Sequence, residues 1–191
     1  MTELGRAPDD DAWSAIDRFD AAADAAWGRI FRGHPVADWV FYLASELGDF
    51  SVIWLLIAAA QGLRSDEDAD ESIRLGLLLL TESALVNQGI KRLVNRPRPG
   101  GVAAPPHHVR RPLTSSFPSG HASSAMAAAG FMSRRHPRAA PLYYGLAVIV
   151  ATSRVHVRVH HASDVIAGAA IGAGFAKVAG RVWPPPSAGR R

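Results

Sequence analysis

The sequence predicts an all-α protein in which several apolar helices pack into one bundle. Three observations lead to this fold class. Apolar residues recur along most of the chain at the three- and four-residue spacing of helices, and no strand-like alternation competes with them. The length of 191 residues suits a single domain with one sizeable core. The chain contains no cysteine, which excludes disulfide scaffolds, cysteine-ligated zinc and thiol catalysis.

Composition alone predicts a soluble protein with an anionic partner. Mean hydropathy is +0.04. The charge-free runs Phe50–Leu63, Ala139–Ser153 and Val165–Ala176 are each shorter than the ~18 residues expected of a membrane helix. Of the 21 basic residues, only Lys91 and Lys177 are lysines, and the planar fork of arginine suits phosphate. A pI of about 10.1 indicates nucleic acid, a membrane surface or a phosphorylated substrate as the partner.

The N-terminal half is expected to hold a polar leader, without the features of a signal peptide, followed by helices. Apolar side chains at helical spacing, with Asp17, Asp20 and Asp24 among them, predict an amphipathic helix. Gly48 is expected to break the apolar segment that follows. The predicted elements are a leader over 1–10, the amphipathic helix over 11–31, a short helix over 35–47, an apolar helix over 50–63 and an acidic loop over 64–71.

The C-terminal half is expected to contain four helices and one long loop. Proline is frequent in the loop over 96–117, which excludes a continuous helix there. Gly168 and Gly172 place small residues in the last helix at the spacing of close helix packing. The predicted elements are helices over 73–94, 119–132, 139–153 and 163–180, a basic turn over 133–138 and a basic, Pro-rich tail over 183–191.

Three clusters of polar residues stand at predicted helix ends: KRLVNRPRP over 91–99, PSGH over 118–121, and the segment from Ser153 to Asp164. The cations Lys91, Arg98 and Arg154 can each hold several oxyanion oxygens. Ser119 and Gly120 begin a helix, so their N–H groups lie at the positive end of its dipole. Together these groups predict a phosphate-binding site.

Two histidines and an aspartate add the groups that phosphoryl transfer needs. Asp164 lies four residues after His160, so the two share a face if the last helix begins early. A carboxylate on one imidazole nitrogen fixes the tautomer and leaves the other nitrogen free to attack. His121 supplies a second imidazole, which can protonate a leaving oxygen. The set predicts phosphoryl transfer without a metal or another cofactor.

In order and without a mismatch, the three clusters resemble the motifs of the type 2 phosphatidic acid phosphatase superfamily, which includes lipid phosphatases and vanadium haloperoxidases. The matching patterns are K-x6-R-P at Lys91, Arg98 and Pro99, P-S-G-H over 118–121, and S-R-x5-H-x3-D at Ser153, Arg154, His160 and Asp164. The resemblance covers about residues 48–179. Many members carry an aromatic residue and a proline after the nucleophile, where this chain has His161 and Ala162.

The resemblance implies a role for each matched residue. His160 would be the nucleophile that forms a phosphohistidine, with Asp164 orienting it and raising its basicity. His121 would donate a proton to the departing group and then activate the hydrolytic water. The groups implied to hold the phosphoryl oxygens are Lys91, Arg98, Ser119, Gly120 and Arg154.

The resemblance also implies a multi-pass membrane protein, a transmembrane bundle of five to six helices preceded by an amphipathic N-terminal helix. The domain organisation is then a leader over 1–10, interfacial helices over 11–47, a phosphatase bundle over 48–182 and a tail over 183–191. The implied activity is hydrolysis of a polyprenyl or glycerolipid phosphate or pyrophosphate. The alternatives are a vanadate-dependent haloperoxidase and a non-catalytic basic protein at a membrane surface. The expected partners are the lipid substrate and the membrane, not nucleic acid, and a homodimer is possible.

Orientation in the membrane follows from the distribution of basic residues. With the three cations of the site set aside, five lie on the active side and eight on the opposite side, which favours an extracytoplasmic active site by the positive-inside rule. If residues 35–47 do not cross the membrane, the count becomes nine against eight. If they do cross, it becomes five against twelve.

Overall fold

The computed structural model describes residues 8–100 and 114–184, and within these ranges the regular structure is entirely helical. The α-helices are α1 (Pro8–Phe31), α2 (Pro35–Gly48), α3 (Val52–Gly62), α4 (Asp66–Ala84), α5 (Lys91–Leu93), α6 (Gly120–Arg135), α7 (Ala140–His156) and α8 (Ala162–Val182). Short 3₁₀ segments, η1 (Asp49–Ser51) and η3 (Pro137–Ala139), precede α3 and α7. A π-helical segment, η2 (Leu85–Ile90), joins α4 to α5. The all-α prediction is confirmed.

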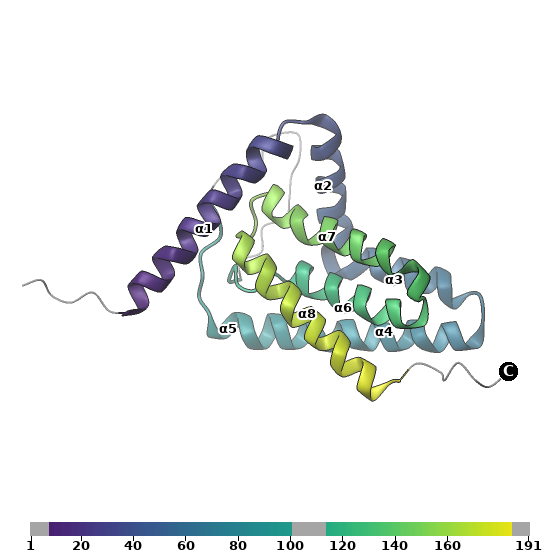
Figure 1. Ribbon diagram of the computed structural model, residues 1–191. Coiled ribbons are helices and arrows are strands. Elements are labelled where there is room, and N and C mark those ends of the chain that lie inside the picture. The colour runs from purple at the N-terminus through teal and green to yellow at the C-terminus, as the bar shows by residue number, and fades with distance from the viewer. Residues whose placement is uncertain (1–7, 101–113, 185–191) are drawn as a thin grey trace, which may run out of the picture.

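Helix α6 lies at the centre of the bundle, with α4, α7 and α8 packed around it and α3 against α4 (Figure 1). Ala122, Ala125 and Ala128 of this helix are fully buried, and their small side chains allow the neighbouring helices to pack close to it. Helices α1 and α2 lie at one end of the bundle, beside the C-terminal end of α7. The core therefore consists of helix faces rich in alanine, supplemented by Trp54, Leu75 and Phe131.

Helices α6 and α8 approach each other at two glycines. A β-carbon on Gly168 would lie 2.3 Å from the carbonyl oxygen of Ser119, and one on Gly172 would lie 2.0 Å from that of Ser123. Both distances are shorter than any real contact, so only glycine allows α8 to lie this close to α6. This confirms the close packing expected at Gly168 and Gly172, and it fixes the position of the turn at Ser119.

The break expected at Gly48 is a sharp bend between α2 and α3. Phe50 and Ser51 have left-handed φ angles of 52° and 60°, which interrupt the helical path. Figure 1 shows α2 turned away from the direction of α3. Residues 35–62 are therefore two helices rather than one straight rod.

The prediction of an acidic loop over 64–71 is wrong, because α4 already begins at Asp66. The hydroxyl of Ser65 caps this helix by accepting a hydrogen bond of 3.1 Å from the N–H of Asp68. Asp66, Glu67 and Asp68 occupy the first turn, where negative charge interacts favourably with the helix dipole. The basic turn expected over 133–138 is also partly wrong, since α6 continues to Arg135.

The ends of the chain are described only in part. Of the predicted leader over 1–10, residues 1–7 lie outside the described residues, and α1 begins at Pro8. Of the predicted tail over 183–191, residues 185–191 lie outside them as well. The amphipathic helix expected over 11–31 corresponds to α1.

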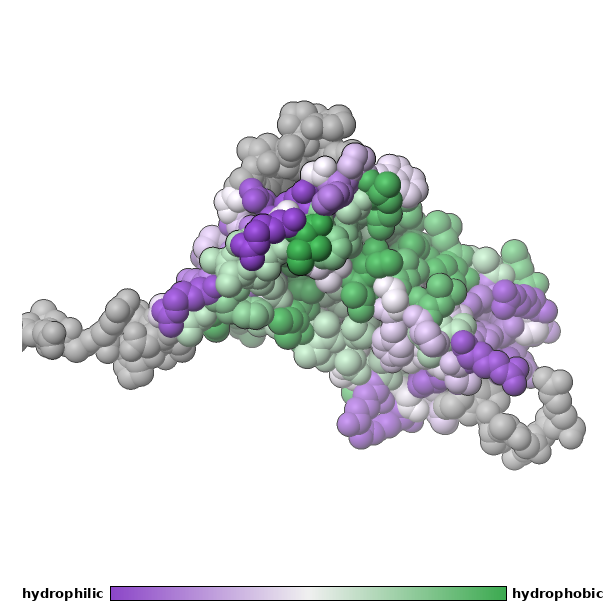
Figure 2. Space-filling view, turned by 45° about the horizontal axis from the view of Figure 1, so that its top comes forward, coloured by the Kyte–Doolittle hydropathy of each residue, from purple (hydrophilic) through white to green (hydrophobic). Residues whose placement is uncertain are grey.

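Two stretches have the length and hydropathy needed to cross a membrane, namely α8 over Ala162–Val182 and the segment Pro35–Gly62, which the bend divides into α2 and α3. Large apolar side chains also lie on the surface of the bundle. Figure 2 shows them gathered over the middle of the molecule, with hydrophilic residues towards its ends. The most exposed of them on α3, α4, α7 and α8 are Leu56, Ile73, Leu80, Leu142, Val148, Ile166, Val178 and Val182. The apolar surface is consistent with a membrane protein rather than with the soluble protein that composition predicted.

We expect Gly168→Ala to destabilise the fold, because its methyl group would push α8 away from Ser119. Overpacking of this kind typically costs about 1–3 kcal/mol, so the midpoint of thermal unfolding in detergent should fall by several degrees. Gly174→Ala is the matched control, since a β-carbon there meets no atom within 4 Å. Equal midpoints for the two variants would contradict the packing described here.

Candidate active site

All eight residues singled out by the sequence motifs lie at the same end of the bundle. They come from the first residue of α5, the C-terminal end of α7, the N-terminal ends of α6 and α8, and the loops beside these helices. These residues are Lys91, Arg98, Ser119, Gly120, His121, Arg154, His160 and Asp164. The fold therefore brings together side chains separated by up to 73 positions in the sequence.

Lys91 faces the first turn of α6. A β-carbon on Gly120 would lie 3.8 Å from Lys91 Nζ and 3.4 Å from Asn87 Oδ1, so the absent side chain leaves the helix N-terminus open towards the ammonium group. Lys91 directly follows the π-helical segment, and π-bulges inside helices occur frequently at functional sites. Ser119 caps α6, its hydroxyl accepting from the N–H of Ala122 at 3.4 Å. The ammonium group and the free N–H groups of α6 thus form one half of an anion site.

Arg98 ties the proline-rich loop to the turn before α8. Its guanidinium donates to the carbonyl oxygens of Val159 at 2.9 Å and Ser115 at 3.2 Å. It also lies 3.2 Å from Nε2 of His160. Because a guanidinium only donates, Nε2 accepts in this contact, so the hydrogen of the neutral ring is on Nδ1.

Arg154 supplies the third cation from the last turn of α7. It is only 2% exposed, and its guanidinium donates to the hydroxyl of Ser45 on α2. Arg154 interacts electrostatically with both His121 and His160. Three cations converge at this end of the bundle, and such an arrangement favours a multiply charged anion.

His160 is buried and oriented by Asp164. Nδ1 of His160 lies 3.7 Å from Asp164 Oδ2, an ion-pair distance that is longer than a hydrogen bond. Burial lowers the pKa of His160 to about 3, and Arg98 and Arg154 reinforce this shift. The imidazole is therefore neutral near pH 7, with its lone pair on Nε2.

The two residues were expected to share a helical face if the last helix begins early, and the structure does not meet this condition. Helix α8 begins at Ala162, so His160 lies in the preceding turn, next to Arg158 with its left-handed φ of 52°. Asp164 instead completes a capping box, its carboxylate accepting from the N–H of His161 at 2.9 Å. His161 and Ala162 thus begin the helix regularly, although they depart from the aromatic residue and proline of the family pattern.

The carboxylate of Asp164 is held by two residues that the sequence motifs did not identify. Arg96 donates to Asp164 Oδ1 at 2.7 Å, and the hydroxyl of Ser116 donates to Oδ2. Asp164 is fully buried, and breaking a buried ion pair of this kind typically costs about 3–5 kcal/mol. Arg96 and Ser116 therefore have the role of positioning residues for Asp164.

The network extends from Arg96 to the amphipathic helix α1. Arg96 also donates to Asp20 Oδ2 at 2.7 Å, and Asp20 accepts from the N–H and the hydroxyl of Ser163. Burial would raise the pKa of Asp20, but the hydrogen bonds from Ser163 and Arg96 outweigh it, so the pKa is lowered. Asp20 was only one of several aspartates in an amphipathic pattern, and nothing local in the sequence distinguished it from Asp17 or Asp24.

His121 lies against the bend between α2 and α3. Its Nε2 is 3.0 Å from Asp49 Oδ1 and 3.2 Å from the carbonyl oxygen of Ser45. A β-carbon on Gly48 would lie 2.6 Å from Cδ2 of this ring, so glycine is what admits the imidazole here. The bend thus holds the ring of a second histidine and gives it a carboxylate partner.

No group of three or more His, Asp and Glu side chains suited to a metal occurs within residues 8–100 and 114–184. His156, another histidine of the third cluster, is buried and accepts from the indole N–H of Trp27 at 3.1 Å. Its Nε2 lies 2.9 Å from Asp38 Oδ1. His156 therefore joins α7 to α1 and α2 rather than facing the cations.

Comparisons with known proteins identify the family of the chain. The sequence profile of the PAP2 superfamily matches residues 72–185. The chain is 36% identical over 129 residues to decaprenylphosphoryl-5-phosphoribose phosphatase of Mycobacterium tuberculosis, an alignment that covers 68% of this chain and 71% of that protein. The phosphatase of the same name from Mycolicibacterium smegmatis is 34% identical over 128 residues, covering 65% and 67% of the two chains.

A solved structure is also similar. The transmembrane PAP2-type phosphatidylglycerolphosphate phosphatase of Bacillus subtilis superposes with a TM-score of 0.68 at 25% identity. The superposition covers 88% of this chain and 86% of that one. The likeness therefore extends over nearly the whole fold, including the helices that carry the site.

We expect Gly48→Ala to lower kcat at least tenfold, because its methyl group displaces the ring of His121. Gly48 has ordinary helical φ and ψ angles, so alanine does not strain the backbone. The measurement is phosphate release by purified protein, with Gly145→Ala as the control because a β-carbon at Gly145 meets nothing within 4 Å. If the substitution acts through His121, adding it to His121→Ala causes no further loss. A further loss of the same size in the double variant would contradict this explanation.

Proposed function

The chain belongs to the PAP2 superfamily, and from this premise we propose that it is a membrane phosphatase that cleaves the phosphate of a polyprenyl or glycerolipid through a phosphohistidine at His160. The observation that carries the proposal is the convergence of three cations and a helix N-terminus around a buried, neutral imidazole. That arrangement suits an anion with several oxygens and one electrophilic centre.

In the proposed reaction, Lys91, Arg98, Arg154 and the first N–H groups of α6 bind the phosphoryl oxygens. The Arg98 guanidinium then donates to the substrate, and Nε2 of His160 faces the phosphorus. Nε2 attacks, the bond from phosphorus to the leaving oxygen breaks, and His121 gives that oxygen a proton. The proton on Nδ1 of His160 stays on that nitrogen and faces the carboxylate of Asp164, which stabilises the positive charge of the ring.

The second half of the reaction restores the enzyme. His121, now neutral, takes a proton from water while the water oxygen attacks the phosphorus of phosphohistidine. The bond from phosphorus to Nε2 breaks, inorganic phosphate leaves, and His160 returns to its neutral form. Asp49 faces the ring of His121 in both steps and stabilises the imidazolium when it forms.

A multi-pass arrangement is supported by the surface of the bundle. Helices α4, α6, α7 and α8 would cross, with α3, which at 11 residues is too short to span the bilayer alone, held against α4. This leaves their exposed apolar side chains in lipid and the site at one membrane surface. On α2, Val36, Trp39 and Leu43 form an exposed apolar face, whereas Phe41 and Ala44 are buried. Because α2 bends away from α3, we place it along the membrane interface on the active side together with α1.

This placement bears on the predicted sidedness. With α1 and α2 on the active side, the basic residues number nine there and eight on the opposite side, so their distribution no longer favours either orientation. The extracytoplasmic active site therefore stays a prediction that this placement does not support.

A cleft beside Arg98 bears on the choice of substrate. It has a volume of about 950 Å³ and lies between α1 and the loop over 93–100. Asp17, Asp24 and His161 line it, and such groups accept hydrogen bonds from hydroxyls. We therefore propose a polyprenyl-phosphoryl sugar phosphate as the substrate, with its sugar hydroxyls in this cleft. The mycobacterial relatives, which are named for such a substrate, support the choice.

The mechanism predicts a covalent intermediate that depends on His160. Wild-type protein in detergent should release phosphate from the lipid substrate in the presence of EDTA and be inhibited by vanadate. His160→Gln should lose activity by at least a thousandfold, whereas the exposed His34→Gln should keep it. Rapid quenching of His121→Ala with ³²P-labelled substrate should trap an alkali-stable phosphoprotein that is missing in His160→Gln. Substantial turnover by His160→Gln would rule out the nucleophile assigned here.

The choice of substrate is tested by a side-by-side assay. It compares a polyprenyl-phosphoryl sugar phosphate with phosphatidylglycerol phosphate, phosphatidic acid and a polyprenyl pyrophosphate.

A further inference from the structure

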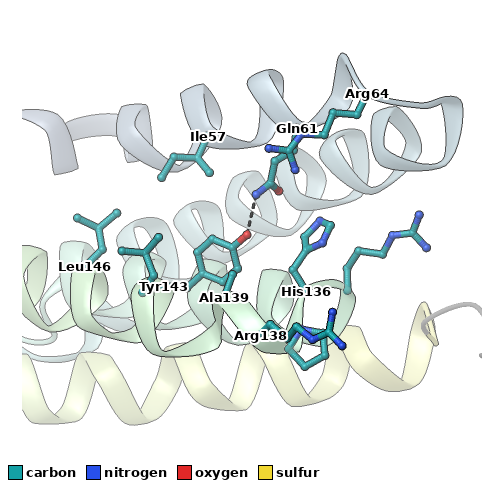
Figure 3. A pocket seen from close by; sticks show the side chains of 11 residues that line it. Ile57, Gln61, Arg64, His136, Arg138, Ala139, Tyr143 and Leu146 are labelled. Carbon is teal, nitrogen blue, oxygen red and sulfur yellow. Dashed lines mark hydrogen bonds between the residues drawn. The ribbon is translucent and has the colours of Figure 1, made fainter.

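A second cavity lies at the end of the bundle opposite the candidate active site. It has a volume of about 830 Å³ and opens between α3 and the junction of α6 with α7 (Figure 3). One wall is apolar, built from Ile57, Leu142 and Leu146. The rim is basic, with Arg64, Arg135, His136 and Arg138. The phosphatase mechanism uses none of these residues.

Two of the rim arginines carry charge that the protein itself does not neutralise. Arg135 donates to Glu67 at 2.9 Å and to Asp68 at 3.2 Å, so its charge is already paired. Arg64 and Arg138, by contrast, have no hydrogen-bond or ion-pair partner among the side chains that the structure describes. Both are exposed at the mouth of the cavity. The mouth therefore has an excess of positive charge suited to an anionic group.

The interior of the cavity offers a polar contact next to its apolar wall. The side-chain amide of Gln61 donates to the hydroxyl oxygen of Tyr143 at 2.6 Å, as the dashed line in Figure 3 marks. The Tyr143 hydroxyl keeps its own hydrogen for donation, and the Gln61 carbonyl keeps its lone pairs for acceptance. A ligand with a hydroxyl or ester oxygen finds both a donor and an acceptor here.

The cavity also lies where the end of the bundle would meet the membrane surface. Leu63 and Leu142 are 89% and 71% exposed beside it, and such surface suits contact with acyl chains. Asp66 begins α4 near this end and Lys91 follows it at the other end. The 25 helical steps from Asp66 to Lys91 span roughly 37 Å at 1.5 Å per residue, which exceeds the hydrocarbon thickness of a bilayer.

From these observations we propose that the cavity binds an anionic glycerophospholipid of the phosphatidylglycerol type. Arg64 and Arg138 contact the phosphate, Tyr143 and Gln61 contact the headgroup or ester oxygens, and the apolar wall holds the start of an acyl chain. A zwitterionic lipid binds more weakly, because its ammonium group would lie among the arginines. The inference rests on the membrane placement in the proposed function, but not on the chemistry at His160.

The test is native mass spectrometry of detergent-solubilised protein titrated with phosphatidylglycerol or phosphatidylcholine. The wild type should retain phosphatidylglycerol at least fivefold better than phosphatidylcholine. The double variant Arg64→Gln/Arg138→Gln should lose that preference. Arg181→Gln is the matched control, since Arg181 is exposed in the last turn of α8 and does not line the cavity. Phosphatase activity in detergent should be the same in all three proteins, which separates this site from the catalytic one.

Two further measurements distinguish a lipid from a free phosphate. Leu142→Gln should weaken phosphatidylglycerol binding without changing the charge of the rim. Glycerol 3-phosphate at millimolar concentration should not displace the lipid. The proposal is overturned if the double variant and the Arg181→Gln control bind phosphatidylglycerol equally, or if the wild type does not discriminate between the two lipids. Full displacement by glycerol 3-phosphate would likewise overturn it in favour of a phosphate site.

Discussion

The buried carboxylate of Asp164 is the charge around which the active end of the protein is organised. An isolated carboxylate with no exposure costs several kcal/mol to desolvate, so the fold must supply partners for it. Arg96, Ser116 and the N–H of His161 provide them from three separate segments. Through Arg96 the same cluster also reaches Asp20, which anchors helix α1 to the start of α8.

The positions of the catalytic groups follow from this cluster. Arg98 lies two residues after Arg96, and Ser119 lies three residues after Ser116. His160 directly precedes His161, whose N–H donates to Asp164. Each partner of the carboxylate therefore fixes the position of a neighbouring residue of the candidate site. Arg154 reaches the site from the end of α7, which packs against the central helix α6. Lys91 reaches it from beyond the end of α4, which also packs against α6.

The sequence predicted much of the fold, because apolar periodicity is a local signal, and motif spacing selected the eight residues that the fold brings to one end of the bundle; their roles stay predictions. Gly168 and Gly172 indicated close packing for the same reason. Arg96, Ser116 and Asp20 could not be predicted, since their roles depend on contacts 68, 48 and 76 positions away. The start of α4 was missed although Ser65 and the three acidic residues after it form a regular helix start. The run of acidic residues in this segment favoured an acidic loop instead.

The claim that burial and the nearby cations keep His160 neutral, with Nδ1 facing Asp164 and Nε2 unprotonated, can be measured by ¹⁵N NMR of histidine-labelled protein in detergent, with the His160 signals assigned by comparison with His160→Gln. The account predicts a protonated Nδ1 and an unprotonated Nε2 at pH 7. Because its pKa is lowered to about 3, the ring should stay neutral as the pH falls to 5. A ring protonated on Nε2, or one that titrates near the ordinary histidine value of about 6.5, would contradict it.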